Sequence, residues 1–161
     1  MRLEAVSSLR NKQPAEAREL LERANATPPI KGDLNNTPFS LLRDADDLFG
    51  TVLEVMAQGH YYWVPMEQLE TLTIKAPQFP RDLLWLPAHL SLRDGAAGPV
   101  FLPALYPGSH EHGDDQVKLG RLTDWKSTDS GPTLGVGLHT YLVDDDGRTL
   151  LEWRQLTVAA D

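Results

Sequence analysis

The sequence contains no cysteine in its 161 residues. This absence excludes a disulfide scaffold, a thiolate zinc site and a cysteine nucleophile, and it fits the reducing environment of a cytoplasm. No stretch approaches the ~18 consecutive apolar residues that a membrane-spanning helix needs. The first residues also lack the apolar core of a secretory signal. We therefore expect a cytoplasmic protein that makes no contact with a membrane.

Basic residues are few and scattered. The chain has 15 Lys and Arg against 23 Asp and Glu, which gives a formal net charge of −8. Proteins that bind nucleic acid usually carry a basic patch, so we expect no nucleic-acid partner. The acidic residues gather in three places, which we interpret as solvated surface: Asp44, Asp46 and Asp47; Asp114 and Asp115; and Asp144, Asp145 and Asp146.

Aromatic residues are absent from the N-terminal part, and all twelve Phe, Trp and Tyr follow a linker rich in Pro, Gly and Asn. This step in composition predicts a boundary between a helical hairpin over residues 1–27 and a β-rich domain over 39–158. Pro14 suits the start of the second helix, whose apolar face includes Leu20 and Leu21. The hairpin is typical of one tetratricopeptide-like repeat, which cannot bury its apolar faces alone. We therefore expect Leu20 and Leu21 to pack on the rest of the chain or on a partner.

Residues 44–58 predict the principal helix of the β-rich domain. Asp44 suits an N-cap, and Asp46 and Asp47 suit the first turn, where the helix dipole favours negative charge. The apolar residues that follow have helical spacing until Gly59: Leu48, Phe49, Val52, Leu53, Val55 and Met56.

Three adjacent aromatic residues follow Gly59 and predict a strand, because neighbouring side chains on a strand point to opposite faces. Tyr61 and Trp63 are expected on one face and Tyr62 on the other, mostly as core. If Tyr61, Tyr62 and Trp63 are instead exposed together, they form an anchor patch for a protein partner.

Apolar and polar residues alternate with a period of two from Val64 onward, which predicts strands near residues 71–75, 86–93, 100–105, 118–125, 134–142 and 151–158. The expected fold class is α+β. It consists of a mainly antiparallel sheet, strongly curved or barrel-like, packed with one principal helix and preceded by the helical hairpin.

The most metal-like cluster is the loop that holds His110, Glu111, His112 and Asp114. A His-x-His pair with nearby carboxylates is able to bind zinc or manganese, although all these donors crowd one loop and a polar surface loop is the favoured interpretation. Ser109 lies outside any Gly-x-Ser-x-Gly nucleophile motif.

The other histidines and the glycine pair have structural interpretations. We interpret His60, His89 and His139 as exposed or as making one ordinary hydrogen bond. Gly135 and Gly137 lack the context of a dinucleotide motif, and we expect an aromatic residue, Tyr141 or Trp153, to pack across them.

Several separated blocks of the sequence cover roughly residues 39–156. In order they include Asp44-Ala45-Asp46, Gly59-His60-Tyr61-Tyr62-Trp63-Val64-Pro65, Arg81-Asp82-Leu83-Leu84-Trp85-Leu86-Pro87-Ala88, Tyr106-Pro107-Gly108-Ser109, Thr123-Asp124-Trp125 and Leu134-Gly135-Val136-Gly137. Together these blocks resemble the ImpE family, also called TagJ or SciE-type proteins.

The resemblance implies a cytoplasmic accessory protein of the bacterial type VI secretion system. It implies an adaptor without catalytic residues or cofactors that binds the small sheath subunit and is linked to the ClpV-type AAA+ ATPase. Members of the family carry several helical repeats before the β-rich part. This sequence shows one helix pair, so we expect either a short variant or a fragment beginning at Met1.

Two other functions remain open from the residues alone. One is a metal-dependent hydrolase that uses His110, Glu111, His112 and Asp114. The other is a small-ligand module with Tyr61, Tyr62 and Trp63 in the mouth of a barrel, which requires a deep apolar pocket with converging polar groups.

Overall fold

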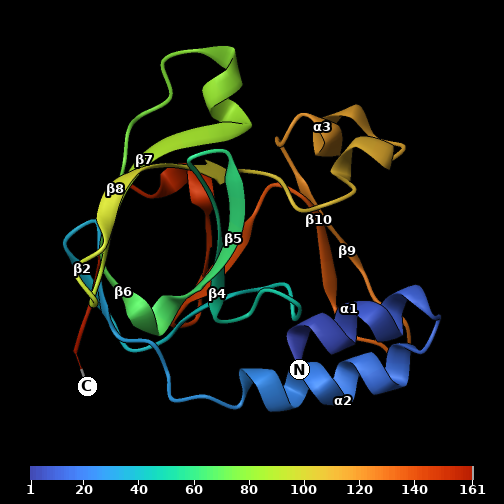
Figure 1. Ribbon diagram of the computed structural model, residues 1–161. Coiled ribbons are helices and arrows are strands. Elements are labelled where there is room, and N and C mark those ends of the chain that lie inside the picture. Colours follow the sequence, from blue (N-terminus) through green and yellow to red (C-terminus); the bar gives the residue numbers. More distant parts are fainter. Residues whose placement is uncertain (161) are drawn as a thin grey trace.

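A computed structural model describes residues 1–160 of the chain. Three antiparallel sheets make up most of the fold, and two helices, α1 (Arg2–Arg10) and α2 (Pro14–Asn25), form a hairpin beside them. A third helix, α3 (Asp115–Lys118), is a single turn (Figure 1). Within residues 1–160, no helix is long and apolar enough to span a lipid bilayer.

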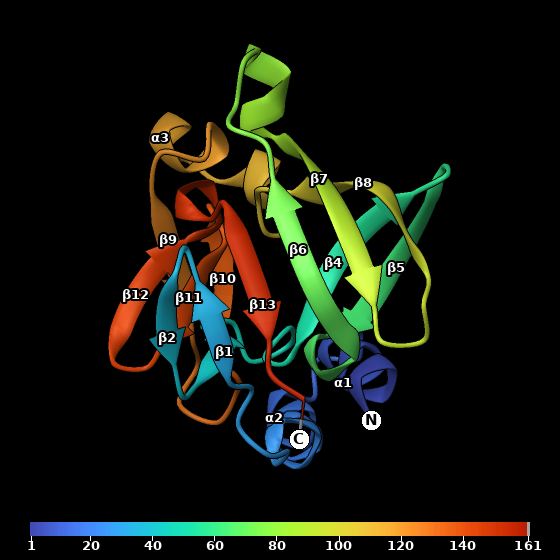
Figure 2. The same ribbon diagram turned by 90° about the vertical axis from the view of Figure 1, so that its left-hand side faces the viewer.

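The largest sheet has eight strands in the order β2-β1-β13-β6-β7-β8-β4-β5. Figure 2 looks onto it from the side of β1, β13 and β6. Its strands are β1 (Gly32–Leu34), β2 (Thr37–Phe39), β4 (Val52–Ala57), β5 (His60–Pro65), β6 (Leu69–Ile74), β7 (Trp85–Leu92), β8 (Ala97–Pro103) and β13 (Gln155–Val158).

This sheet is open, with β2 and β5 at its two edges. The sheet is mainly antiparallel, but the predicted barrel-like form is wrong, because the sheet is not closed. The predicted principal helix is also wrong, because residues 52–57 form strand β4. The sheet bends around a core that includes Leu53, Leu72, Leu86 and Trp153, but its first and last strands do not pair.

Two smaller sheets complete the fold. One pairs β9 (Thr123–Lys126) with β10 (Leu134–Gly137). The other has the order β12-β11-β3, with β3 (Leu42–Asp44), β11 (Thr140–Val143) and β12 (Asp146–Thr149). The predicted strand over 134–142 is thus two strands, because the chain breaks at Leu138 and His139.

Short 3₁₀ turns connect several of these strands. They are η1 (Met66–Gln68), η2 (Pro80–Leu83), η3 (Ser109–Glu111) and η4 (Leu150–Glu152). The turn η4 and the residues after it occupy the first part of the predicted last strand, which begins only at Gln155.

The predicted helix over 44–58 is the largest error in the sequence-based fold. Residues 52–57 form β4, which pairs with β5 along its whole length. Gln58 and Gly59 both have positive φ, at 52° and 77°, as a two-residue hairpin turn requires. Val52 to Val55 are all buried, so both faces of β4 are covered. A strand buried on both faces has a continuous apolar run, which periodicity does not separate from a helix.

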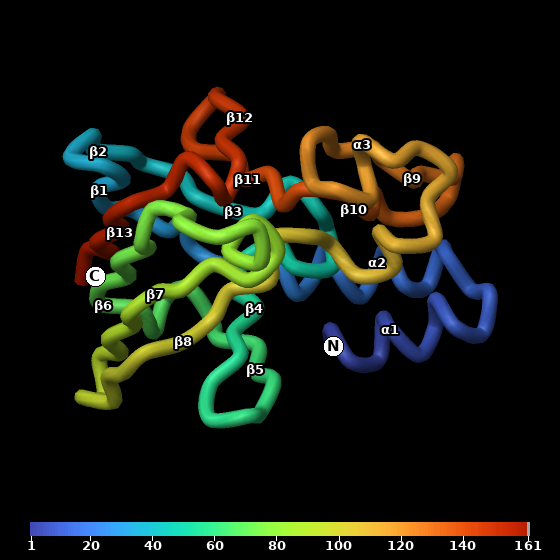
Figure 3. The backbone as a smooth tube through the Cα atoms, turned by 90° about the horizontal axis from the view of Figure 1, so that it is seen from above, coloured from blue at the N-terminus to red at the C-terminus, as the bar shows by residue number. Residues whose placement is uncertain are grey.

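The helical hairpin lies beneath one end of the β9–β10 ribbon, away from β1 and β2 (Figure 3). Ala5 on α1 and Ala17 and Leu21 on α2 are fully buried between the helices. Leu48, from the segment between β3 and β4, packs against this small core. The hairpin is therefore in contact with the segment between β3 and β4, which carries Asp46 and Asp47.

Candidate functional site

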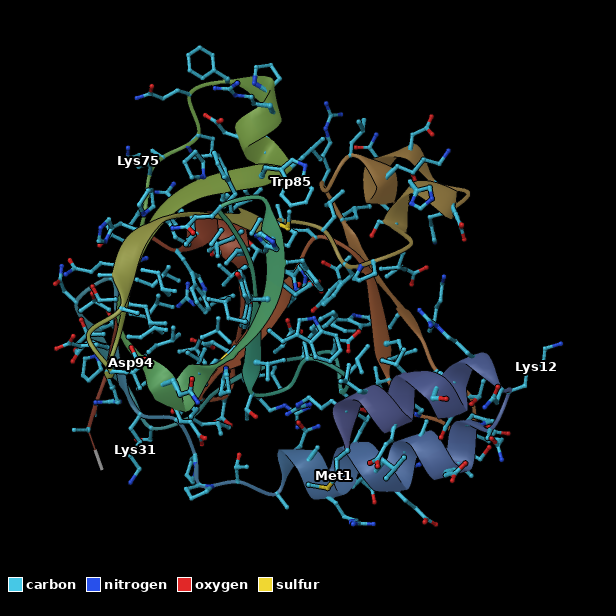
Figure 4. All side chains as sticks on the ribbon, in the orientation of Figure 1. Met1, Lys12, Lys31, Lys75, Trp85 and Asp94 are labelled. Carbon is cyan, nitrogen blue, oxygen red and sulfur yellow. The ribbon has the colours of Figure 1, made fainter. Side chains whose placement is uncertain are left out.

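An open cleft of about 500 Å³ lies between β5, the start of β7 and the segment after β8. Its walls are mostly apolar and include Tyr61, Trp85, Leu105 and Tyr106. Trp85 begins β7 and is 44% exposed. Figure 4 shows it on the side of the sheet that faces the α3 segment.

The floor of the cleft holds a buried carboxylate, Glu54 of β4. One of its oxygens accepts a short hydrogen bond from the Tyr61 hydroxyl. The other oxygen lies 2.8 Å from Nε2 of His139. The Tyr61 hydroxyl in turn accepts a hydrogen bond from the Trp63 indole, at 2.6 Å. The paired strands β4 and β5 bring Glu54, Tyr61 and Trp63 together, because Glu54 lies opposite Trp63 in the register.

His139 lies between two carboxylates. Its Nδ1 is 2.8 Å from Asp44, and its Nε2 is 2.8 Å from Glu54. Burial lowers the pKa of His139, but the hydrogen bonds and charges of the two carboxylates outweigh burial and raise it to about 9. At neutral pH the ring is therefore a cation that donates from both nitrogens, since only the protonated ring has two donors.

Tyr106 covers the other side of this cluster. Its hydroxyl donates to Asp44 at 2.5 Å and accepts from the backbone N–H of Thr140 at 3.1 Å. Its ring centre lies 3.9 Å from that of His139. Burial, the first cause, and the charge of Asp44 raise the pKa of the Tyr106 hydroxyl, so it stays protonated and acts as a donor.

Gly135 is the residue that makes room for the Tyr106 ring. A Cβ at this position would lie 2.3 Å from Tyr106 Cε2. The expectation that an aromatic residue packs on this strand is thus met at Gly135 by Tyr106, rather than by the expected Tyr141 or Trp153.

The acidic residues of the segment between β3 and β4 accept hydrogen bonds from backbone N–H groups. Asp46 accepts hydrogen bonds from the backbone N–H groups of Gly135 at 2.6 Å and Leu48 at 2.7 Å. Burial raises the pKa of Asp46 to about 7, against the opposite effect of these hydrogen bonds. Asp47 accepts from the N–H of Thr133 at 2.8 Å. Asp44 and Asp46 are buried, so the interpretation of this group as solvated surface, with Asp44 as an N-cap, is wrong.

Arg2 joins the helical hairpin to the same segment. Its guanidinium donates to the carbonyl of Leu48 at 2.8 Å, to the side chain of Asn25 at 2.8 Å and to the hydroxyl of Thr51 at 2.9 Å. Asn25 also donates to the carbonyl of Asp47, at 2.9 Å. The hairpin is therefore held to the segment between β3 and β4 by hydrogen bonds from Arg2 and Asn25, and those from Arg2 are charge-assisted.

The loop that was the alternative candidate for a metal site does not bring its donors together. His110 is exposed and faces Glu111 across 3.6 Å, whereas His112 lies 3.1 Å from Asp124. Asp114 caps α3 by accepting from the N–H of Gln116. Within residues 1–160, no group of three or more His, Asp or Glu side chains has the arrangement of a metal site.

The residues predicted to bind a partner differ in exposure. Tyr61 and Tyr62 are 51% and 48% exposed on the edge strand β5. Trp63 is partly buried against Phe49, with ring centres 5.7 Å apart. On α2, Leu20 is partly buried and Leu21 is fully buried.

Ser109 is also buried and has fixed partners. Its hydroxyl donates to the carbonyl of Tyr106 at 2.5 Å and accepts from the N–H of Gly137 at 2.8 Å. These bonds hold the segment after β8 onto β10. The cleft as a whole is mostly apolar and has a buried carboxylate at its floor.

Asp44, Glu54, Tyr106 and His139 are the residues that the sequence-based analysis did not bring together. His139 was expected to be exposed or to make one ordinary hydrogen bond, and it is instead 2% exposed with two charged partners. The available signal was the charged residue Glu54 inside the apolar run of β4. It was missed because residues 44–58 were predicted to form a helix, on whose exposed face a glutamate is ordinary.

Comparison with known proteins identifies the family of the chain. The family model described as ImpE protein matches residues 36–157. The chain belongs to the ImpE family. The matched residues include every side chain of the cleft floor and walls, so the cleft is a part of the ImpE-family region.

Two relatives show how far the similarity extends. This ImpE-family chain is 44% identical over 141 residues to the type VI secretion system accessory component TagJ of Pseudomonas aeruginosa. The match covers 87% of this chain and 49% of TagJ. The chain also superimposes on the crystal structure of a Vibrio parahaemolyticus protein with a TM-score of 0.83 at 30% identity, covering 99% of this chain and 58% of that protein. The chain thus spans about half the length of these relatives.

Proposed function

We propose that this chain acts as a non-enzymatic adaptor of a type VI secretion system. The observation that carries the proposal is the 44% identity to a protein named as an accessory component of that system, over most of the present chain. The adaptor is proposed to work in the bacterial cytoplasm, to bind the small sheath subunit and to act together with the ClpV-type ATPase.

Features of the surface support an adaptor role over catalysis. Large apolar side chains that line the cleft are exposed, namely Tyr61, Leu84 and Trp85. Tyr and Trp are the residues most enriched at the energetic centres of protein interfaces. The titratable groups nearby are paired with one another, and His139 has both ring nitrogens occupied by carboxylates.

The proposal is tested by a binding experiment with purified components. The chain is immobilised, and the small sheath subunit, the large sheath subunit and the ATPase of the same secretion system are applied separately and together. We expect the small sheath subunit to be retained alone, and the ATPase to be retained only when sheath is present.

A variant with Tyr61→Ala and Trp85→Ala tests whether the exposed aromatic region takes part. Phe79→Ala is the matched control, because Phe79 is 57% exposed but lies outside the cleft. Equal retention by all variants would place the partner surface elsewhere, and failure to retain any component would contradict the adaptor proposal.

A further inference from the structure

The charges beneath the cleft do not balance. Asp44 and Glu54 are both buried, and their ion pairs in the described residues are made with one shared cation, His139. Two carboxylates and one imidazolium leave a net charge of −1 in this cluster. The buried carboxyl of Asp46, whose backbone N–H donates to Asp44, lies beside it and supplies no positive charge. A buried charge without a counter-charge is costly, so a cation nearby is favoured.

The cleft itself offers no such cation. The residues that line it include neither Lys nor Arg, and its single basic residue, His110, has a side chain that is 80% exposed. The rest of the lining is aromatic, aliphatic, proline or glycine, apart from Glu54 and Ser109. The two hydroxyls beside the floor, Tyr61 and Tyr106, are neutral donors that leave the negative charge in place.

The walls are suited to a cation with an apolar stem. Trp85 and Tyr61 are about half exposed and both face the cleft, and the electron-rich face of an aromatic ring attracts ammonium and guanidinium groups. Long basic side chains also bury their methylene groups against apolar surface while the charged end seeks a polar partner. Glu54 would supply that partner at the floor.

We propose that the cleft bounded by Tyr61, Trp85 and Tyr106 binds an arginine or lysine side chain of a partner protein, with the charged end directed at Glu54. A guanidinium group fits best, since it is planar and stacks on aromatic rings. The Glu54 oxygens already accept from Tyr61 and His139, but each carboxylate oxygen is able to accept a second hydrogen bond. The inference concerns the cleft alone and does not depend on which protein supplies the side chain, so it stands or falls separately from sheath binding.

The test uses blocked amino acids that mimic a side chain within a protein. The indole N–H signals of the protein are followed by NMR during titration with N-acetyl-arginine amide and N-acetyl-lysine amide. N-acetyl-citrulline amide is the neutral control, because it has nearly the shape of the arginine compound without its charge. We expect a saturable shift of the Trp85 signal with the basic compounds, and at least ~10-fold weaker binding of the citrulline compound.

Variants locate the site. Trp85→Ala is expected to weaken binding of N-acetyl-arginine amide at least ~10-fold, as followed through the Trp63 signal, whereas Phe79→Ala binds like the parent. Glu54→Gln is expected to have an effect of the same size. If Glu54→Gln fails to fold, the citrulline compound and Trp85→Ala still decide the matter.

Three results would overturn the inference. Equal binding of the arginine and citrulline compounds would show that charge is not recognised. Unchanged binding by Trp85→Ala, or shifts confined to Trp125, would place the ligand elsewhere. Binding of tetramethylammonium or of free arginine in preference to the blocked arginine and lysine compounds would indicate a small-molecule site rather than a site for a protein side chain.

Discussion

The imidazole of His139 lies 2.8 Å from the carboxylate of Asp44, and both side chains are buried. The two residues are 95 positions apart in the chain. Their contact joins β3 to the segment that separates β10 from β11. The fold around the cleft therefore depends on a buried ion pair.

Replacing His139 with alanine is expected to destabilise the protein by ~3–5 kcal/mol, because Asp44 and Glu54 would remain buried without their shared cation. The free energy of unfolding is measured by urea denaturation at neutral pH. His89→Ala is the matched control, since His89 is exposed on β7, and it is expected to change stability by less than ~0.5 kcal/mol. Equal effects of the two substitutions would contradict the role assigned to the ion pair.

The stability of the protein is expected to fall as the pH rises from neutral toward 10. His139 has a folded-state pKa of about 9 against an ordinary value of 6.5. When a histidine has a higher pKa in the folded state, its full contribution to stability is present at pH values below the unfolded-state pKa. The contribution is lost as the pH rises through the folded-state pKa. The loss is on the order of 3 kcal/mol. Denaturation curves at several pH values from 6.5 to 10 measure it.

The His139→Ala variant provides the control for this pH dependence. Its stability is expected to change much less over the same range, because the titrating ring is gone. A parent protein whose stability is flat from pH 6.5 to 10 would show that His139 is not a cation in the folded state.

Gly135→Ala is expected to destabilise the protein by ~1–3 kcal/mol, because its Cβ would overlap the buried ring of Tyr106. Gly98→Ala is the matched control on β8, where a Cβ would meet no atom within 4 Å. Thermal denaturation of the two variants compares them directly. If the control loses as much stability as Gly135→Ala, the close approach to Tyr106 is not the cause.

Arg2→Ala is expected to loosen the helical hairpin more than it disturbs the sheets. The guanidinium makes several charge-assisted hydrogen bonds to the segment after β3, and each is worth ~1.5–3 kcal/mol when partly buried. Hydrogen exchange is expected to quicken in α1 and α2, with little change in β6 and β7. Arg10→Ala, at an exposed position of α1, serves as the control. Uniformly faster exchange through the whole chain would contradict this division.

The strands β6, β7 and β8 lie close to where the sequence places them. Leu86, Leu90 and Leu92 lie at every second position because one face of β7 is covered and the other is exposed. A repeat of two residues in the sequence predicts such a strand directly. The helical hairpin is also visible in the sequence, since Pro14 marks its second helix.

The cleft floor could not be predicted in the same way. Glu54 lies in a strand with both faces covered, so its neighbours show no alternation. The partners of His139 lie 95 and 85 positions away, and no local pattern in a single sequence records such distances. The acidic residues at 44, 46 and 47 have the composition of a helix start. Instead, the carboxylates of Asp46 and Asp47 accept from the backbone N–H groups of Gly135 and Thr133, and that of Asp44 contacts His139 and Tyr106.

The attachment of Arg2 and Asn25 to the backbone around Leu48 has a mechanical consequence. The same short segment carries Asp44 and Asp46, which fix His139 and Gly135. The helix pair is therefore joined through this one short segment to the contacts that hold His139 and Gly135, and a displacement of the helix pair would act on those contacts directly.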